Sequence, residues 1–183
     1  MTRLLQQFRT KILPELRQEL KFANDLAVPR VEKIMVNAGV GKLLQQQPKS
    51  LDEFIKAMAK ITGQQPQVTR AKKAISGFKI RQGQAVGLMV TLRGKRMYDF
   101  LDKLINATLP RSRDFRGLSK KGFDRHGNYS LGLRDHMVFP EMAQEEIGTG
   151  FGLEVTIATT AKTDEAAYKL LKHLGFPFKE NLT

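Results

Sequence analysis

Residues 69–97 read TRAKKAISGFKIRQGQAVGLMVTLRGKRM, a segment in which two strand-like runs flank a basic loop. The first run covers about residues 67–70 and the second about residues 85–92, both rich in strand-forming side chains. The dozen residues between them show no periodic pattern, and such loops are usually functional or disordered. The segment therefore predicts two neighbouring antiparallel strands joined by a long basic loop.

The charge in this segment has one sign. It carries eight Lys or Arg residues and no Asp or Glu, and the acid-free run extends from residue 54 to residue 98 with ten Lys or Arg residues. A charge run is usually a solvated surface, but the absence of acids, the interleaved Phe78 and the flexible Gly77 and Gly83 together favour contact with RNA. Phe78 has a second interpretation, as an anchor of the loop on the core, and the sequence leaves both roles open.

The composition of the whole chain agrees with an anionic partner. The 183 residues are 41% hydrophobic and 27% charged, which is typical of one globular domain over residues 1–183. The formal net charge of +13 is not typical, and it indicates nucleic acid as the first candidate partner and an anionic membrane as the second. The chain has no cysteine, and no segment has the apolar length of a signal peptide or a membrane span, so a soluble intracellular protein without disulfides is expected.

Three elements are predicted before the basic segment. Apolar residues at three- and four-residue spacing predict an amphipathic helix over residues 3–22, packed on the domain, with a bend or a break at Pro14. Residues 30–38 predict a strand that ends in a glycine-containing turn at residues 39–42. Residues 50–61 predict a helix with a capping box formed by Ser50 and Glu53 and an end at Gly63.

After the basic segment, residues 94–109 predict a helix that Pro110 ends, followed by a second basic loop over residues 110–128. Phe115 and Phe123 in that loop are expected in the core rather than against RNA. Residues 129–133 and 153–159 predict strands, and Thr163 begins a last helix that Gly175 ends. The order of elements predicts an α+β fold, with helices on one face of a single antiparallel-rich sheet.

The usual catalytic and metal-binding motifs do not match. A phosphate-binding loop at residues 37–42 would need glycine and Ser or Thr where the chain has Val36 and Leu43. The three histidines lack the spacing of zinc ligands. Asp135 and His136 are not expected to share a site, because adjacent residues of a strand point to opposite faces. No metal, cofactor, small-molecule substrate or enzyme activity is therefore expected.

Five blocks of the sequence carry a family resemblance. They are ITGQQPQVTRAKKAISGFKIRQG (61–83), VTLRGKRMYDFLDKLINATLPRSRDFRGL (90–118), GNYSLGL (127–133), FPE (139–141) and TIATTAKTDEAAYKLLKHLGFPF (156–178). In order and spacing they resemble the bacterial ribosomal protein L5 family, over about residues 28–178. The resemblance implies a structural protein of the central protuberance of the large subunit, in a cytoplasmic or an organellar ribosome. It also implies contacts with 5S rRNA, 23S rRNA, the peptidyl-site tRNA, neighbouring ribosomal proteins and a small-subunit head protein.

The roles of individual residues follow from the resemblance alone. It implies that a polar trio recognises 5S rRNA, within an rRNA-binding surface of Asn37, Gln64, Thr91, Arg93, Gly39 and Gly41. The tRNA-facing loop of the family corresponds to residues 70–81, with contacts expected from Arg70, Lys72, Lys73, Phe78, Lys79 and Arg81. In the implied mechanism, Lys and Arg bind phosphates while the trio Asn37, Gln64 and Thr91 fixes the register on a structured RNA.

Three other functions are compatible with a basic chain of this size. An RNA-modifying enzyme or nuclease would need a carboxylate, histidine or metal cluster beside the basic loop, and the sequence shows none. A membrane-binding protein would present a basic helix with a broad apolar face, whereas the basic run here is punctuated by glycine. An RNA-binding chaperone that does not reside stably in the ribosome would share every feature of the sequence, so it stays the alternative.

Overall fold

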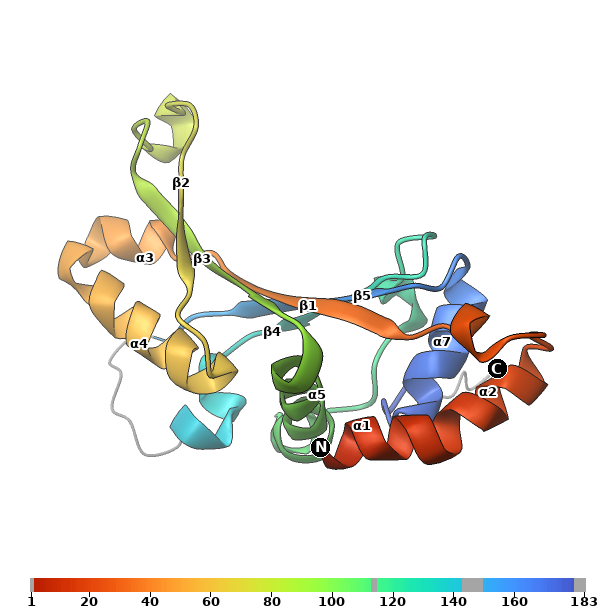
Figure 1. The fold of residues 1–183 in the computed structure, drawn as a ribbon. Helices are drawn as coiled ribbons and strands as arrows, with labels where there is room; N and C mark the ends of the chain where they lie inside the picture. Colours follow the sequence, from red (N-terminus) through yellow and green to blue (C-terminus); the bar gives the residue numbers. More distant parts are fainter. Residues whose placement is uncertain (1, 113–114, 143–149, 180–183) are drawn as a thin grey trace. The chain divides into compact units, whose positions relative to one another are not determined.

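Figure 1 shows a computed structural model of the chain, in which residues 2–112, 115–142 and 150–179 are described. The helices and strands are, in order, α1 Arg3–Gln7, α2 Leu13–Glu19, β1 Val31–Ala38, α3 Gly41–Gln46, α4 Leu51–Thr62, β2 Gln67–Arg70, β3 Ala85–Leu92, α5 Gly94–Lys103, α6 Leu109–Arg111, β4 Tyr129–Leu133, β5 Leu153–Thr159 and α7 Asp164–His173. The predicted helices and strands are all present. The short helix α3 stands where a turn was predicted.

The five strands form one sheet in the order β2-β3-β1-β5-β4. β2 pairs antiparallel with β3, with Gln67 opposite Met89 and Thr69 opposite Gly87. The register then shifts between Thr69 and Arg70, where the chain leaves β2 for the basic loop. The prediction of an α+β fold with one antiparallel-rich sheet, and a basic loop between two neighbouring strands, is confirmed.

The chain divides into two compact units. One comprises Met1–Ile34, Leu92–Leu131 and Thr156–Thr183, and the other comprises Met35–Thr91 and Gly132–Val155. The strands β1, β3, β4 and β5 contribute residues to both units. The single-domain organisation expected from the chain length stays a prediction.

In the unit that contains both termini, the N-terminal helical stretch packs through one buried stripe. The stripe consists of Leu4, Phe8, Ile12 and Leu16. The ring of Phe8 lies 6.3 Å from the ring of Tyr98 on α5, and the Arg3 guanidinium lies 3.1 Å from the Asp102 carboxylate. Because burying a side chain of this size contributes roughly 1.5–3 kcal/mol, the stripe accounts for the docking of the helix.

A π-helical turn precedes a proline twice in this unit. Phe8–Ile12 leads into α2 with Pro14, and Leu104–Thr108 leads into α6 with Pro110. Proline has no N–H, and its ring collides with the carbonyl four residues back, which an α-helix cannot absorb without distortion. The wider π turn shifts the hydrogen bonds to five-residue spacing and accommodates the proline. The helix end predicted at Pro110 is therefore wrong, because α6 continues to Arg111.

Four aromatic rings close the core of the same unit. The ring of Phe123 lies 4.7 Å from that of Tyr129, and the ring of Phe178 lies 5.4 Å from Tyr129 and 4.9 Å from Tyr168. Phe123 thus packs against the ring of the buried Tyr129, and both Phe123 and Phe115 are half-buried. Residues 113 and 114 of the second basic loop lie outside the described residues.

In the other unit, α4 covers one face of the sheet. Phe54, Met58 and Ile61 are 0% exposed, and the ring of Phe54 meets that of Phe151 edge-on at 5.3 Å. Gly63 ends α4 at φ 68°, as predicted. The predicted capping box is wrong: a 3-10 turn at Pro48–Ser50 leads directly into α4, and the hydroxyl of Ser50 bonds the Gln47 side chain at 3.3 Å.

Candidate nucleic-acid interface

The unit comprising Met35–Thr91 and Gly132–Val155 has an open sheet face opposite α4. Every second residue of β1 and β3 is buried, namely Val36 and Ala38 on β1 and Leu88 and Val90 on β3. The residues between them lie on the other face, because successive side chains of a strand point to opposite sides. These side chains are half-buried or exposed and comprise Met35, Asn37, Met89 and Thr91, joined on β2 by Gln67 and Thr69. We call these six residues the open face.

Two members of the predicted trio are brought together at one end of the open face. The side-chain Nε2 of Gln64 donates a hydrogen bond to the backbone carbonyl of Thr91 at 3.3 Å. Gln64 directly follows Gly63, where α4 ends, and the Thr62 hydroxyl lies 3.0 Å from its carbonyl. The end of α4 and the end of β3 therefore hold Gln64 and Thr91 in a fixed relation.

Asn37 lies farther along the same face. A Cβ atom added to Gly87 would lie 2.9 Å from the carbonyl oxygen of Ala38, so the end of β1 is next to Gly87. Gly87 precedes Thr91 by four residues, which corresponds to roughly 13 Å along a strand. The structure thus separates Asn37 from the pair Gln64 and Thr91, although all three border one face.

The two glycines of the predicted rRNA surface differ in their surroundings. Gly39 is exposed, and a Cβ atom added there would meet nothing within 4 Å. A Cβ atom on Gly41 would lie 3.2 Å from the Cα and the carbonyl oxygen of Val86, so the absence of a side chain lets α3 begin against β3. Gly41 therefore has a packing role whatever it binds.

Arg93 belongs to the unit that contains both termini. It directly follows β3, is exposed, and occupies the N-cap position of α5 in an extended conformation. The first turn of α5 contains no acidic residue, unlike those of α4 and α7. Arg93, Lys95 and Arg96 instead place positive charge at the start of this helix.

The basic loop is an ordered extension of the β2–β3 hairpin. The backbones of Ala71, Gly83 and Gln84 exchange hydrogen bonds of 2.9 Å, and Ile75 pairs with Ile80 around a 3-10 turn at Ser76–Phe78. Figure 1 shows this loop continuing beyond the ends of β2 and β3. The loop thus has more structure than its sequence predicts.

The side chains of the loop face solvent. The side chain of Phe78 is 69% exposed, so it does not anchor the loop on the core. The backbone carbonyl of Phe78 accepts a 2.8 Å hydrogen bond from Nε2 of Gln45 on α3. The exposed cations of the loop are Lys72, Lys73, Lys79 and Arg81, and none forms an ion pair within the described ranges. Arg70 donates a 3.0 Å hydrogen bond to the Gly83 carbonyl, which ties the base of the loop together.

Asp135 and His136 lie together, contrary to the expectation for a strand. Asp135 caps a 3-10 turn at His136–Val138, and its carboxylate lies 3.2 Å from Nδ1 of His136. The buried imidazole stacks on Phe151 at 4.2 Å, and Nδ1 lies 3.3 Å from the Phe151 N–H. Burial lowers the pKa of His136, against the opposing effect of the Asp135 carboxylate. The imidazole is enclosed, so the pair does not form a catalytic site.

The described part of the chain contains no group of three or more His, Cys, Asp or Glu residues that could hold a metal ion. None of its helices is long and apolar enough to cross a membrane.

Residues of the open face were missed by the sequence interpretation. Thr69 lies opposite Gly87, and Met89 lies between Gly87 and Thr91 on the same side of β3. The alternation of β3, together with the antiparallel pairing of β2, carries the signal that would have found them.

The chain is similar to known proteins over nearly its whole length. A family model described as "Ribosomal protein L5" matches residues 24–81, and one described as "ribosomal L5P family C-terminus" matches residues 85–178. The chain is 51% identical to the large ribosomal subunit protein uL5 of Halothermothrix orenii over 180 residues, covering 98% of this chain and 100% of that protein. It is 52% identical to uL5 of Natranaerobius thermophilus (97% and 99% covered) and 54% identical to uL5 of Acaryochloris marina (92% and 93% covered).

Proposed function

Because this chain belongs to the ribosomal protein L5 family and is a structural constituent of the large ribosomal subunit, we propose that it binds 5S rRNA in the central protuberance. In the same proposal, other surfaces contact 23S rRNA and a small-subunit head protein, and the basic loop contacts the peptidyl-site tRNA. The chain acts as a scaffold and not as an enzyme.

One observation carries the proposed contact of the basic loop with tRNA. Lys72, Lys73, Lys79 and Arg81 are exposed on one ordered loop, with no carboxylate paired to them in the described residues. Uncompensated cations at this density repel one another, and a phosphate backbone relieves that repulsion. The exposed ring of Phe78 at the tip adds a surface on which a nucleotide can stack.

The polar side chains supply the RNA specificity that the cations lack. Phosphate contacts position a protein on RNA without identifying it, whereas amide and hydroxyl groups can read base edges and 2′-hydroxyls. The side chain of Gln64 is held 3.3 Å from the Thr91 carbonyl. The amide of Gln64 and the hydroxyl of Thr91 can therefore contact RNA with little further ordering. In the proposal, Gln64, Thr91 and Asn37 select 5S rRNA.

The start of α5 supports a phosphate contact at Arg93. A helix N-terminus carries a partial positive charge, and α5 adds Arg93 and Lys95 to it with no acid in its first turn. Such an end is stabilised when an anion binds.

The first experiment identifies the RNA. The tagged chain is expressed in a bacterium, recovered from the lysate, and the bound RNA is sequenced. We expect 5S rRNA to dominate, and recovery of RNA without enrichment of 5S rRNA would overturn the assignment.

The second experiment separates the two surfaces. Asn37→Ala and Thr91→Ala are expected to weaken binding to isolated 5S rRNA, whereas Lys72→Gln with Lys73→Gln spares that binding and reduces crosslinking to peptidyl-site tRNA in ribosomes. Equal loss of 5S rRNA binding in both sets would refute this division.

The third experiment measures salt dependence. If about six phosphates are neutralised, log K against log salt concentration has a slope of roughly −4 to −5. A slope near zero for 5S rRNA would contradict the electrostatic part of the mechanism.

A further inference from the structure

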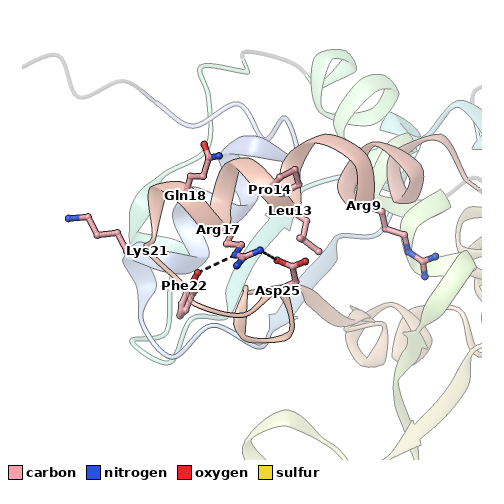
Figure 2. A pocket seen from close by; sticks show the side chains of 8 residues that line it. All are labelled: Arg9, Leu13, Pro14, Arg17, Gln18, Lys21, Phe22 and Asp25. Atoms are coloured by element: carbon pink, nitrogen blue, oxygen red, sulfur yellow. Dashed lines mark hydrogen bonds and ion pairs between the residues drawn. The ribbon is translucent and has the colours of Figure 1, made fainter.

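A shallow groove of about 670 Å³ lies along the solvent side of the N-terminal helix. It is lined by Arg9, Leu13, Pro14, Arg17, Gln18, Lys21, Phe22 and Asp25 (Figure 2). All eight residues belong to the unit that contains both termini, so the groove is not part of the open face or of the basic loop. It contains three cations and one carboxylate.

Arg17 is a fixed wall of this groove. Its guanidinium donates hydrogen bonds to the Asp25 carboxylate at 2.9 Å and to the backbone carbonyls of Ala23 at 2.8 Å and Phe22 at 3.4 Å. These bonds hold the turn after α2 against the helix, and they neutralise the carboxylate of Asp25. The net charge that the groove offers to a ligand therefore comes from Arg9 and Lys21.

The acids of the same helix are engaged elsewhere. Glu19 lies 2.9 Å from Nε2 of His173 and 3.3 Å from Nζ of Lys169, and Glu15 lies 3.3 Å from Nδ1 of His173. His173 and Lys169 are on α7, so both glutamates are held on the α7 side of the helix. The charges of α2 are thus segregated, with paired acids on one side and the cationic groove on another.

Arg9 and Lys21 are positioned to receive a ligand. Both are exposed, and neither forms an ion pair in the described residues. Lys21 has a left-handed backbone with φ 55°, which a non-glycine residue rarely adopts. Figure 2 shows the Arg9 and Lys21 side chains extending outward near opposite ends of the groove, whereas Arg17 is turned toward Asp25.

We propose that this groove binds the sugar–phosphate backbone of a ribosomal RNA strand, as a second RNA contact separate from the open face and the basic loop. Arg9 precedes α2 and Lys21 follows it, so the length of this seven-residue helix, about 10 Å, lies between them, and the two cations suit an elongated anion rather than a single small one. The half-exposed surfaces of Leu13 and Phe22 provide apolar contact for riboses or bases. The proposal rests on residence in the large subunit and is independent of the proposed 5S rRNA contact.

The test uses the absence of cysteine from the chain. A single Gln18→Cys substitution carries a tethered iron chelate, and large subunits assembled with this chain are exposed to conditions that generate hydroxyl radicals at the iron. We expect cleavage of an rRNA strand near residue 18. When Arg9→Gln and Lys21→Gln are added, this cleavage should fall about tenfold or more, because two phosphate contacts are lost.

The matched control removes the same charge outside the groove. Lys11→Gln with Lys172→Gln changes two exposed lysines of the same unit, and cleavage from residue 18 should persist. The proposal is overturned if the Gln18→Cys chain cuts no rRNA, if it cuts only a neighbouring protein, or if both charge variants reduce cleavage equally. Binding of the variants to isolated 5S rRNA is measured separately, so failure of the groove is distinguishable from failure of the 5S rRNA proposal.

Discussion

The amide of Gln64 is bonded to the backbone carbonyl of Thr91 at 3.3 Å, which links the end of α4 to the end of β3. The bond holds a loop residue on a strand, and both side chains are half-buried. This relation gives Gln64 a structural role that can be measured without RNA.

Gln64→Leu is expected to lower the free energy of unfolding by about 1 kcal/mol, because the hydrogen bond to Thr91 is lost while the volume is nearly kept. Urea unfolding of the free chain measures the change. Gln67→Leu on β2, which is exposed and carries no side-chain hydrogen bond among those described, should change the value by less than about 0.5 kcal/mol. Equal losses in the two variants would contradict the role of the Gln64 bond.

Gly87 is a point of close approach between β3 and its neighbours. A Cβ atom there would lie 2.8 Å from the Thr69 hydroxyl oxygen and 2.9 Å from the Ala38 carbonyl oxygen. Gly87→Ala is therefore expected to destabilise the chain by about 1–3 kcal/mol, since backbone must move. Gly132→Ala on β4, where nothing lies within 4 Å, should be neutral or slightly stabilising in the same thermal unfolding assay. A neutral Gly87→Ala variant would show that the strands separate at low cost.

His136 predicts a pH dependence of stability. Burial lowers its pKa in the folded chain from the ordinary value of 6.5, and its Nε2 has no hydrogen-bond partner in the described residues. Below pH 6.5, His136 therefore binds a proton in the unfolded chain but not in the folded chain. The free energy of unfolding should fall as the pH drops from 6.5 toward the lower folded pKa, by at most about 1.4 kcal/mol per pH unit from this group.

Urea unfolding between pH 5 and pH 7 tests this dependence. His136→Phe keeps a ring against Phe151 but cannot titrate, so the slope below pH 6.5 should decrease even if the variant is less stable overall. His126→Gln, which changes an exposed histidine, should leave the slope in place. An unchanged slope in His136→Phe would show that other groups cause the dependence.

Local sequence signals were sufficient for most elements. Period-two alternation indicated β1, and strand-forming residues indicated β2 and β3. Thr163 caps α7 through its hydroxyl oxygen, which accepts the Ala166 N–H at 3.4 Å, as its position before two acids indicates. These signals act within one element, where a side chain and its partner are separated by few residues. They need no knowledge of the sheet.

The failures have a common physical cause in tertiary packing. Pro110 was expected to end a helix, yet Leu104 in the π turn and Leu109 directly before the proline are buried, and their packing holds the helical backbone up to Pro110. Strand register likewise places the carbonyl of Ala38, which follows Asn37, beside Gly87, whereas Gln64 is bonded to Thr91 four residues farther along β3. Register is set by the assembled sheet, and a single sequence shows the face of a residue but not its level along the strand.

If the start of α5 binds RNA as proposed, its charge should lower the stability of the free chain. Lys95 lies in a first turn without acids, where its charge opposes the helix dipole. Lys95→Glu should therefore raise the free energy of unfolding of the free chain by about 0.3–1 kcal/mol and should weaken binding to 5S rRNA, because the anion-binding end loses its charge. Lys172→Glu in the last turn of α7 makes the same change where a cation is favourable, so it should lower stability. Thermal unfolding at low salt measures stability, and filter binding measures the affinity for 5S rRNA. A loss of stability in Lys95→Glu, or unchanged binding to 5S rRNA, would contradict this account of α5.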